Sequence, residues 1–140
     1  MSEWEEKSLG DFITLKRGYD LPERLREEGT IPIYSSSGIS GFHSQSKVNP
    51  PGVVTGRYGT IGNLFLCNEP FWPLNTTLYV QDFKGSDEVF VYYFLQKFNW
   101  NQFNDKSAVP GINRNDLHAE PILVPPVDEQ KKIAAVLSCL

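Results

Sequence analysis

Cysteine, histidine and long apolar runs are all scarce in this sequence, and each shortage excludes a class of protein. Two cysteines and two histidines occur among 140 residues, so neither a disulfide scaffold nor a zinc site is expected. No apolar run approaches the roughly 18 residues of a membrane-spanning helix. The amino terminus is acidic and lacks the basic-then-apolar order of a signal peptide, which favours a cytoplasmic protein.

The composition is that of an ordinary globular domain. Hydrophobic residues make up 40% of the chain and charged residues 21%, which fits neither a disordered nor a fibrous protein. A chain of this length can bury one core and leaves little room for a second domain.

Acidic residues are unevenly distributed along the chain. The net charge of −4 by itself argues against nucleic acid as a partner. Eight of the seventeen acids, however, precede residue 29, and between residues 29 and 81 Glu69 stands alone against Lys47 and Arg57. Since salt screens exposed charges beyond about 8 Å, the acid-poor middle is compatible with a DNA-binding surface. Simple solvation of these charges explains them equally well.

Short strands are expected through most of the chain, from alternating or continuous apolar runs bounded by turn residues. Pro32 suggests an edge strand, and the hydroxyl-rich segment 35–41 is expected to be a loop. Ser8 and Asp11 have the spacing of a capping box. The expected strands cover residues 12–16, 31–34, 53–55, 64–67, 77–80 and 122–124, and residues 23–29 are expected to form a loop or one helical turn.

A helix is expected after Ser86, which can act as its N-cap. Val91, Phe94, Leu95 and Phe98 then fall on one helical face. This spacing favours a place in the core over an aromatic ligand platform.

A second helix is expected from residue 128 to residue 140, with an apolar stripe of Ile133, Val136, Leu137 and Leu140. Burial of these four side chains contributes about 1.5–3 kcal/mol each, whereas ordering each backbone residue costs about 1–2 kcal/mol. Such a short helix therefore needs a surface to dock on. We expect it to begin a longer helix or to form one half of an interchain contact.

The sequence disfavours two enzymatic alternatives. The glycine-spaced segment 56–62 is neither a dinucleotide fingerprint nor a P-loop, and an apparent strand follows it. We interpret it as a connection between strands, with Arg57 available to a guanine or a phosphate. His43 and His118 each have hydroxyl or carboxyl neighbours in sequence, but no nucleophile elbow is present. No catalytic residue and no metal ligand is therefore assigned.

Three patterns together resemble the specificity subunits of type I restriction-modification systems. They are Trp4…Leu9-Gly10-Asp11…Gly18, then Arg57-x-Gly59-Thr60-x-Gly62, and finally Pro125-Pro126-x-x-Glu129-Gln130-x-x-Ile133-Ala134-x-x-Leu137. The resemblance implies an α+β fold with a curled, mixed sheet and a few short helices. Residues 1–126 would form one target recognition domain, and residues 127–140 the start of a spacer and dimerisation helix.

The resemblance also implies a function and partners. Such a subunit has no catalytic residues and no cofactor of its own, and it reads half of a split sequence in double-stranded DNA. Adenine methyltransferase subunits, which use S-adenosylmethionine, assemble on it, and a motor-nuclease subunit that uses ATP can join. The chain lacks the second recognition domain and almost all of the spacer helix of such a subunit, so we expect either a fragment or a short protein that pairs with another copy through its C-terminal helix.

Polar residues at predicted loop and helix ends are the candidates for DNA contact, because Arg, Asn, Ser and Thr read base edges. The alternative is a protein-interaction module that associates through its last helix and never touches DNA. The candidate DNA-binding residues are Ser36, Ser37, Arg57, Tyr58, Asn75, Thr76, Lys106, Asn113 and Arg114; the candidate partner-helix residues are Ile133, Val136, Leu137 and Leu140.

Overall fold

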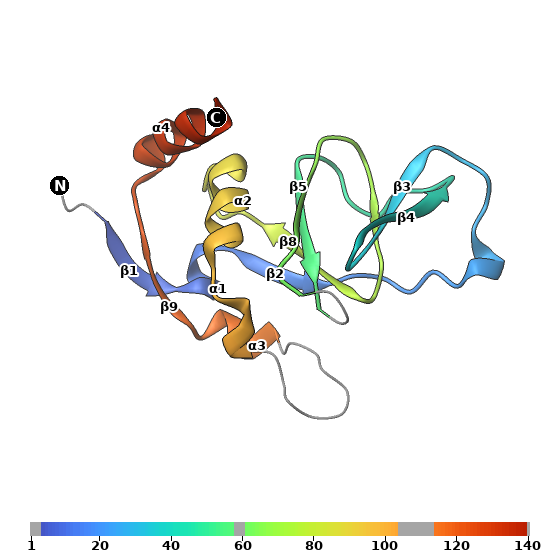
Figure 1. The fold of residues 1–140 in the computed structure, drawn as a ribbon, viewed down its shortest axis with the longest axis horizontal. Coiled ribbons are helices and arrows are strands. Elements are labelled where there is room, and N and C mark those ends of the chain that lie inside the picture. Colours follow the sequence, from blue (N-terminus) through green and yellow to red (C-terminus); the bar gives the residue numbers. More distant parts are fainter. Residues whose placement is uncertain (1–3, 58–60, 104–113, 140) are drawn as a thin grey trace.

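A computed structural model describes residues 4–57, 61–103 and 114–139, and it has the expected α+β architecture (Figure 1). Short 3₁₀ turns occupy Glu23–Leu25 and Trp100–Phe103. The strands are β1 (Glu5–Ser8), β2 (Thr14–Arg17), β3 (Ile31–Ser35), β4 (Gly38–His43), β5 (Gly52–Gly56), β6 (Leu64–Cys67), β7 (Trp72–Pro73), β8 (Thr77–Asp82) and β9 (Pro121–Val124). The helices are α1 (Leu9–Phe12), α2 (Glu88–Lys97), α3 (Arg114–His118) and α4 (Val127–Ser138).

The main core lies between α2 and an antiparallel sheet of order β2-β8-β5-β6. Alternate side chains of these strands, such as Leu15 and Leu78, are fully buried with Val91 and Leu95 of α2. The expected apolar face of this helix is therefore confirmed at its centre. Phe98 differs, because the helix ends at Lys97 and Phe98 is its C-cap.

The edge position expected for Pro32 is wrong, because β3 is the middle strand of a second sheet of order β4-β3-β7. Pro32 pairs with Phe42 of β4. On the other side, the parallel partner β7 is only two residues long and pairs with Ile33 and Tyr34. Proline is tolerated here because the short neighbour does not reach it.

The loop expected over residues 35–41 is half wrong, because β4 begins at Gly38. The turn is confined to two serines, and Gly38 adopts a φ of +116° directly after them. A register shift between Ile33 and Tyr34 marks a bulge in the same hairpin. Glycines that suggested a loop thus serve a tight turn and a bulge within paired strands.

Helix starts follow the expected capping chemistry, with one correction. Ser8 accepts the N–H of Asp11 at 3.1 Å and caps α1, as its spacing predicts. The N-cap of α2, in contrast, is Asp87 and not Ser86: Asp87 Oδ1 accepts the N–H of Phe90 at 2.9 Å. Ser86 instead donates its backbone N–H to Phe83 in the preceding turn.

The last helix docks on its own chain, as its marginal length requires. Gln130 and Ala134 are buried, and α4 lies beside α2 in Figure 1. The preceding strand β9 pairs with β1, the first strand of the chain. Among the described helices, none is long and apolar enough to cross a membrane.

Candidate nucleic-acid interface

Three separate parts of the chain meet at residues 73–77, the connection between β7 and β8. Gly18 and Tyr19 donate their backbone N–H groups to carbonyls of this segment at 3.0 and 2.8 Å. The segment itself donates to the carbonyl of Tyr34 at 2.9 Å and accepts the N–H of Arg57 at 2.8 Å. Segment 73–77 thereby joins the end of β2, the end of β3 and the end of β5.

Close backbone approach explains the glycines of the amino-terminal pattern. A Cβ at Gly18 would lie 2.0 Å from the carbonyl oxygen of Leu74, well inside any allowed contact. A Cβ at Gly10 would lie 2.9 Å from the Cβ of His118 on α3. Both positions therefore need glycine for packing, and Gly18 holds segment 73–77 in place.

Two of the predicted DNA-contacting loops are in direct contact with each other. The half-buried Arg57 donates through Nε and Nη2 to the carbonyl oxygen of Asn75, at 3.3 and 2.9 Å. The hydroxyl of the next residue, Thr76, is buried and has no hydrogen-bond partner among the described residues. The backbone of one loop thus orients the guanidinium of the other.

The predicted serine pair forms the β3–β4 hairpin turn beside this site. Ser35 Oγ donates to the carbonyl of Gly38 at 3.1 Å and accepts the N–H of Ser37 at 3.3 Å, so Ser35 shapes the turn. Ser37 is exposed and Ser36 half-buried. The adjoining residue Tyr34 is the one bound to segment 73–77, which places the hairpin next to the Arg57 loop.

The remaining predicted contacts are only partly visible. Tyr58, Lys106 and Asn113 lie outside the described residues. Arg114 begins α3, and only its backbone is described.

Both histidines hold chain segments together. His118 Nε2 accepts the backbone N–H of Leu15 at 3.0 Å and so fastens α3 to β2. His43 Nδ1 accepts the N–H of Glu27 at 2.9 Å, and its ring stands edge-on to Trp72. Among the described residues, no group of three or more His, Cys, Asp or Glu is arranged to hold a metal ion.

A basic and aromatic cluster that sequence reasoning missed lies beside segment 73–77. We call it the Tyr19 cluster, and it consists of Lys16, Tyr19, Lys47, Trp72 and Tyr79. Lys16 Nζ lies 5.1 Å from the centroid of the Tyr19 ring and 3.2 Å from its hydroxyl. Lys47 Nζ lies 5.3 Å from the same ring and 5.1 Å from that of Trp72. One half-buried tyrosine therefore holds two ammonium groups.

Hydrogen bonding fixes the position of the Tyr19 ring. The Tyr19 hydroxyl lies 2.7 Å from the Tyr79 hydroxyl. Trp72 Nε1 donates to the backbone carbonyl of Tyr19 at 3.2 Å. The hydrogen bond from Tyr79 lowers the pKa of Tyr19, and the neighbouring Lys16 and Lys47 add to the effect. Burial raises the pKa of Tyr79. The sequence contained no signal for this cluster, because the pairing of Lys16 with Tyr79 depends on the register between β2 and β8.

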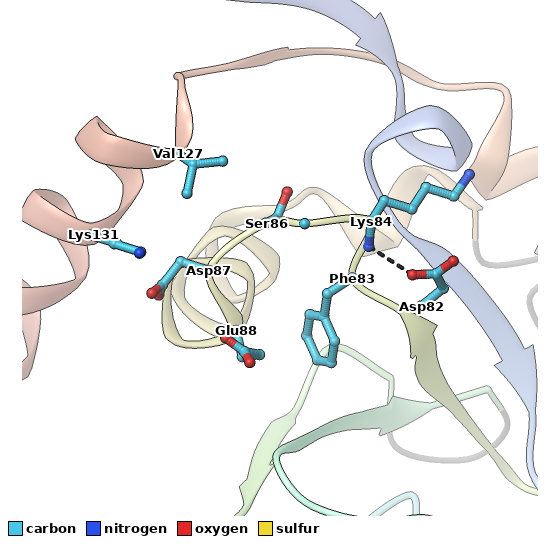
Figure 2. Close-up of a pocket in the computed structure, with 9 residues that line it drawn as sticks. Asp82, Phe83, Lys84, Ser86, Asp87, Glu88, Val127 and Lys131 are labelled. Atoms are coloured by element: carbon cyan, nitrogen blue, oxygen red, sulfur yellow. Dashed lines mark hydrogen bonds between the residues drawn. The ribbon is translucent and has the colours of Figure 1, made fainter.

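A cavity of about 350 Å³ lies elsewhere, at the start of α2 (Figure 2). Figure 2 shows its walls formed by the turn after β8 and by Val127 and Lys131 of α4. Three carboxylates, from Asp82, Asp87 and Glu88, line it. These carboxylates outnumber Lys84 and Lys131, which also line the cavity, so its lining is poorly suited to a phosphate.

The carboxy-terminal pattern Pro125-Pro126-x-x-Glu129-Gln130 has a structural explanation at one buried side chain. Gln130 is 2% exposed; its Oε1 accepts the N–H of Asp87 at 2.8 Å, and its Nε2 donates to the carbonyl of Pro125 at 3.0 Å. The preceding Glu129 accepts the indole N–H of Trp4 at 3.0 Å. The pattern thus fastens α4 to the start of α2 and to the amino-terminal segment.

The predicted partner-helix residues occupy different environments on α4. Val136 is 64% exposed, whereas Ile133 is half-buried against the main core. Leu137 is half-buried, and Leu140 lies outside the described residues.

Comparison with known proteins identifies relatives across the whole chain. A curated relative, the type I restriction enzyme EcoprrI specificity subunit of Escherichia coli, is 26% identical over 141 residues. That match covers 96% of this chain and 35% of the relative. The chain thus spans about a third of the curated relative it matches.

Solved structures share the fold. The S subunit of a type I restriction-modification system from M. genitalium superposes with a TM-score of 0.80 at 21% identity, over 98% of this chain and 38% of that one. The HsdS subunit of Thermoanaerobacter tengcongensis gives 0.74 at 18% identity, over 98% and 37%. The family model of the type I restriction modification DNA specificity domain matches residues 1–140. The chain therefore belongs to the family of type I restriction-modification DNA specificity domains.

Proposed function

We propose that this chain recognises one half of a split DNA target, as the recognition part of a type I specificity subunit. The match of the family model to residues 1–140 carries this proposal. Residues 1–126 are the recognition domain, and residues 127–140 begin the spacer and dimerisation helix. The domain acts by binding alone, without a cofactor, in the cytoplasm; S-adenosylmethionine and ATP belong to its partner subunits.

Base contacts are assigned to the loops around segment 73–77. Their support is geometric: the hairpin at Ser36 and Ser37, the Arg57 loop and residues 75–76 are joined by backbone and guanidinium hydrogen bonds. Arg57 and Asn75 carry groups that read guanine and adenine in the major groove. Tyr58, Lys106, Asn113 and Arg114 are proposed as further DNA-contacting residues from the sequence alone.

The partners are proposed from the same family. Adenine methyltransferase subunits and a motor-nuclease subunit assemble on the specificity subunit, and α4 joins the chain to a second copy or to the rest of a longer spacer. The exposed side chain of Val136 supports a contact on this helix.

Selection of bound sequences from a random duplex pool, with the adenine methyltransferase subunit present, tests the proposal. We expect enrichment of one short, defined half-site, and loss of that enrichment when Ser37 and Arg57 are replaced together by alanine. Recovery of an unenriched pool by the wild-type protein would refute DNA recognition.

The second candidate function, a protein-interaction module acting through α4, is favoured by the net charge of −4 and by the exposure of Val136. The change Val136→Asp separates the two. If the loops read DNA, this variant leaves half-site enrichment intact. If the chain is an interaction module, the variant abolishes association with a partner through α4. Size-exclusion chromatography of the same variant reports whether α4 associates.

A further inference from the structure

The two lysines of the Tyr19 cluster carry charge that no acid neutralises among the described residues. Among the described residues, the one ion pair joins Lys7 to Glu5, both on β1. Asp20 follows Tyr19 in sequence but forms no ion pair with either lysine, all three being described residues. Contact with an aromatic face holds a cation in place without cancelling its charge. Lys16 and Lys47 therefore form a fixed positive site.

This site adjoins the proposed base-reading loops. Tyr19 is bonded through its backbone to one end of segment 73–77, and Arg57 is bonded to the other end. β2, which carries Lys16, lies in the same sheet as β8, the strand that follows this segment (Figure 1). The cluster and Arg57 thus flank a single short connection.

The charge of the site suits a phosphodiester. Lysine ammonium groups bind phosphates as point charges, and contacts to phosphate fix the register of a protein on the duplex. The acid-poor stretch from residue 29 to residue 81, which contains Lys47, adds no competing carboxylate apart from Glu69.

We propose that Lys16 and Lys47, held by the rings of Tyr19 and Trp72, bind phosphates of the DNA backbone and position the duplex against segment 73–77. This inference rests on the proposed function and adds to it a sequence-independent anchor. Lys16 and Lys47 are positioning residues, whereas the loop residues distinguish bases.

The salt dependence of DNA binding tests this assignment. Fluorescence anisotropy is measured with the full chain at several potassium chloride concentrations, on the selected half-site duplex and on a random pool. Each neutralised phosphate contributes a slope of about −0.9 in log K against log salt. Lys16→Gln and Lys47→Gln should each reduce the slope by about one unit and weaken binding roughly five- to tenfold near 0.1 M salt, equally on both DNAs.

Lys132→Gln is the matched control, because it removes the same charge from an exposed site on α4. Its slope should equal that of the wild type. If both cluster variants keep the wild-type slope while the wild type still prefers its half-site, the phosphate anchor is refuted and the proposed function survives. If the wild type binds neither DNA, the proposed function and the anchor both fail.

Amine acetylation of the wild-type protein gives a readout that needs no variant. DNA should protect Lys16 and Lys47 at least threefold more than Lys132. Equal labelling with and without saturating DNA would overturn the assignment.

Discussion

Replacement of Gln130 should destabilise the protein far more than its polar character suggests. The side chain is 2% exposed and bonds both the N–H of Asp87 and the carbonyl of Pro125. Gln130→Ala leaves a part-buried donor at Asp87 and a buried acceptor at Pro125 unpaired, each at a cost of about 1–3 kcal/mol. The expected loss in the free energy of unfolding is therefore about 2–6 kcal/mol, a large share of the roughly 5–15 kcal/mol typical of a domain.

Urea denaturation, followed by circular dichroism and tryptophan fluorescence, measures this loss. Gln102→Ala is the control, because Gln102 is exposed and its contact with Glu120 is long, at 3.5 Å. Its effect should stay within about 0.5 kcal/mol. A Gln130→Ala variant within that same range would refute the reasoning that Gln130 fastens α4 to α2.

The variant Gln130→Glu tests the direction in which stability changes with pH. Burial raises the pKa of a carboxyl group above its usual value of about 4.3, and only the protonated form can donate to Pro125. A raised folded-state pKa means that stability is retained at low pH and lost as pH rises through that pKa. The variant should therefore fall further below the wild type at pH 8 than at pH 5.

Three further predictions follow from single sites. Gly18→Ala should cost about 3 kcal/mol or prevent folding, because its Cβ would lie 2.0 Å from the oxygen of Leu74; thermal denaturation measures this, and an unchanged midpoint would contradict it. Burial raises the pKa of the Cys67 thiol to about 11, so a thiol reagent at pH 8 should label the exposed Cys139 and not Cys67 until the protein unfolds; mass spectrometry of the native protein reads the ratio. Arg57→Ala should weaken binding of the selected half-site by about 1–3 kcal/mol if Arg57 reads a guanine, and equal affinity in a competition assay would remove Arg57 from the site.

Local patterns predicted the secondary structure best where one short-range interaction decides it. The capping of α1 by Ser8 and the buried face of α2 follow from spacing alone. At α2 two adjacent residues, Ser86 and Asp87, are both good N-caps, and only the turn that binds Ser86 selects the second. The sequence did not predict β7, because a strand of two residues is too short to show an alternating apolar pattern. Its pairing with β3 is a long-range contact.

The candidate site was harder to predict from the sequence than the fold. Sequence composition drew attention to Arg57 and Asn75, and their contact supports a shared surface. The Tyr19 cluster unites residues from positions 16 to 79, so no sequence window contains it. Gln130 stood within a recognised pattern, but its role depends on the burial of α4 against Asp87.

The pairing of β1 with β9 makes the whole unit transferable. These strands run antiparallel, with Glu5 opposite Val124, so the polypeptide enters and leaves at neighbouring points. Folds with adjacent entry and exit tolerate insertion into a host chain and circular permutation. A graft of residues 5–124 between two closely spaced positions of another polypeptide would keep this strand pair but remove α4, so the graft must extend to residue 138 to retain the bonds of Gln130 and the burial of Ala134.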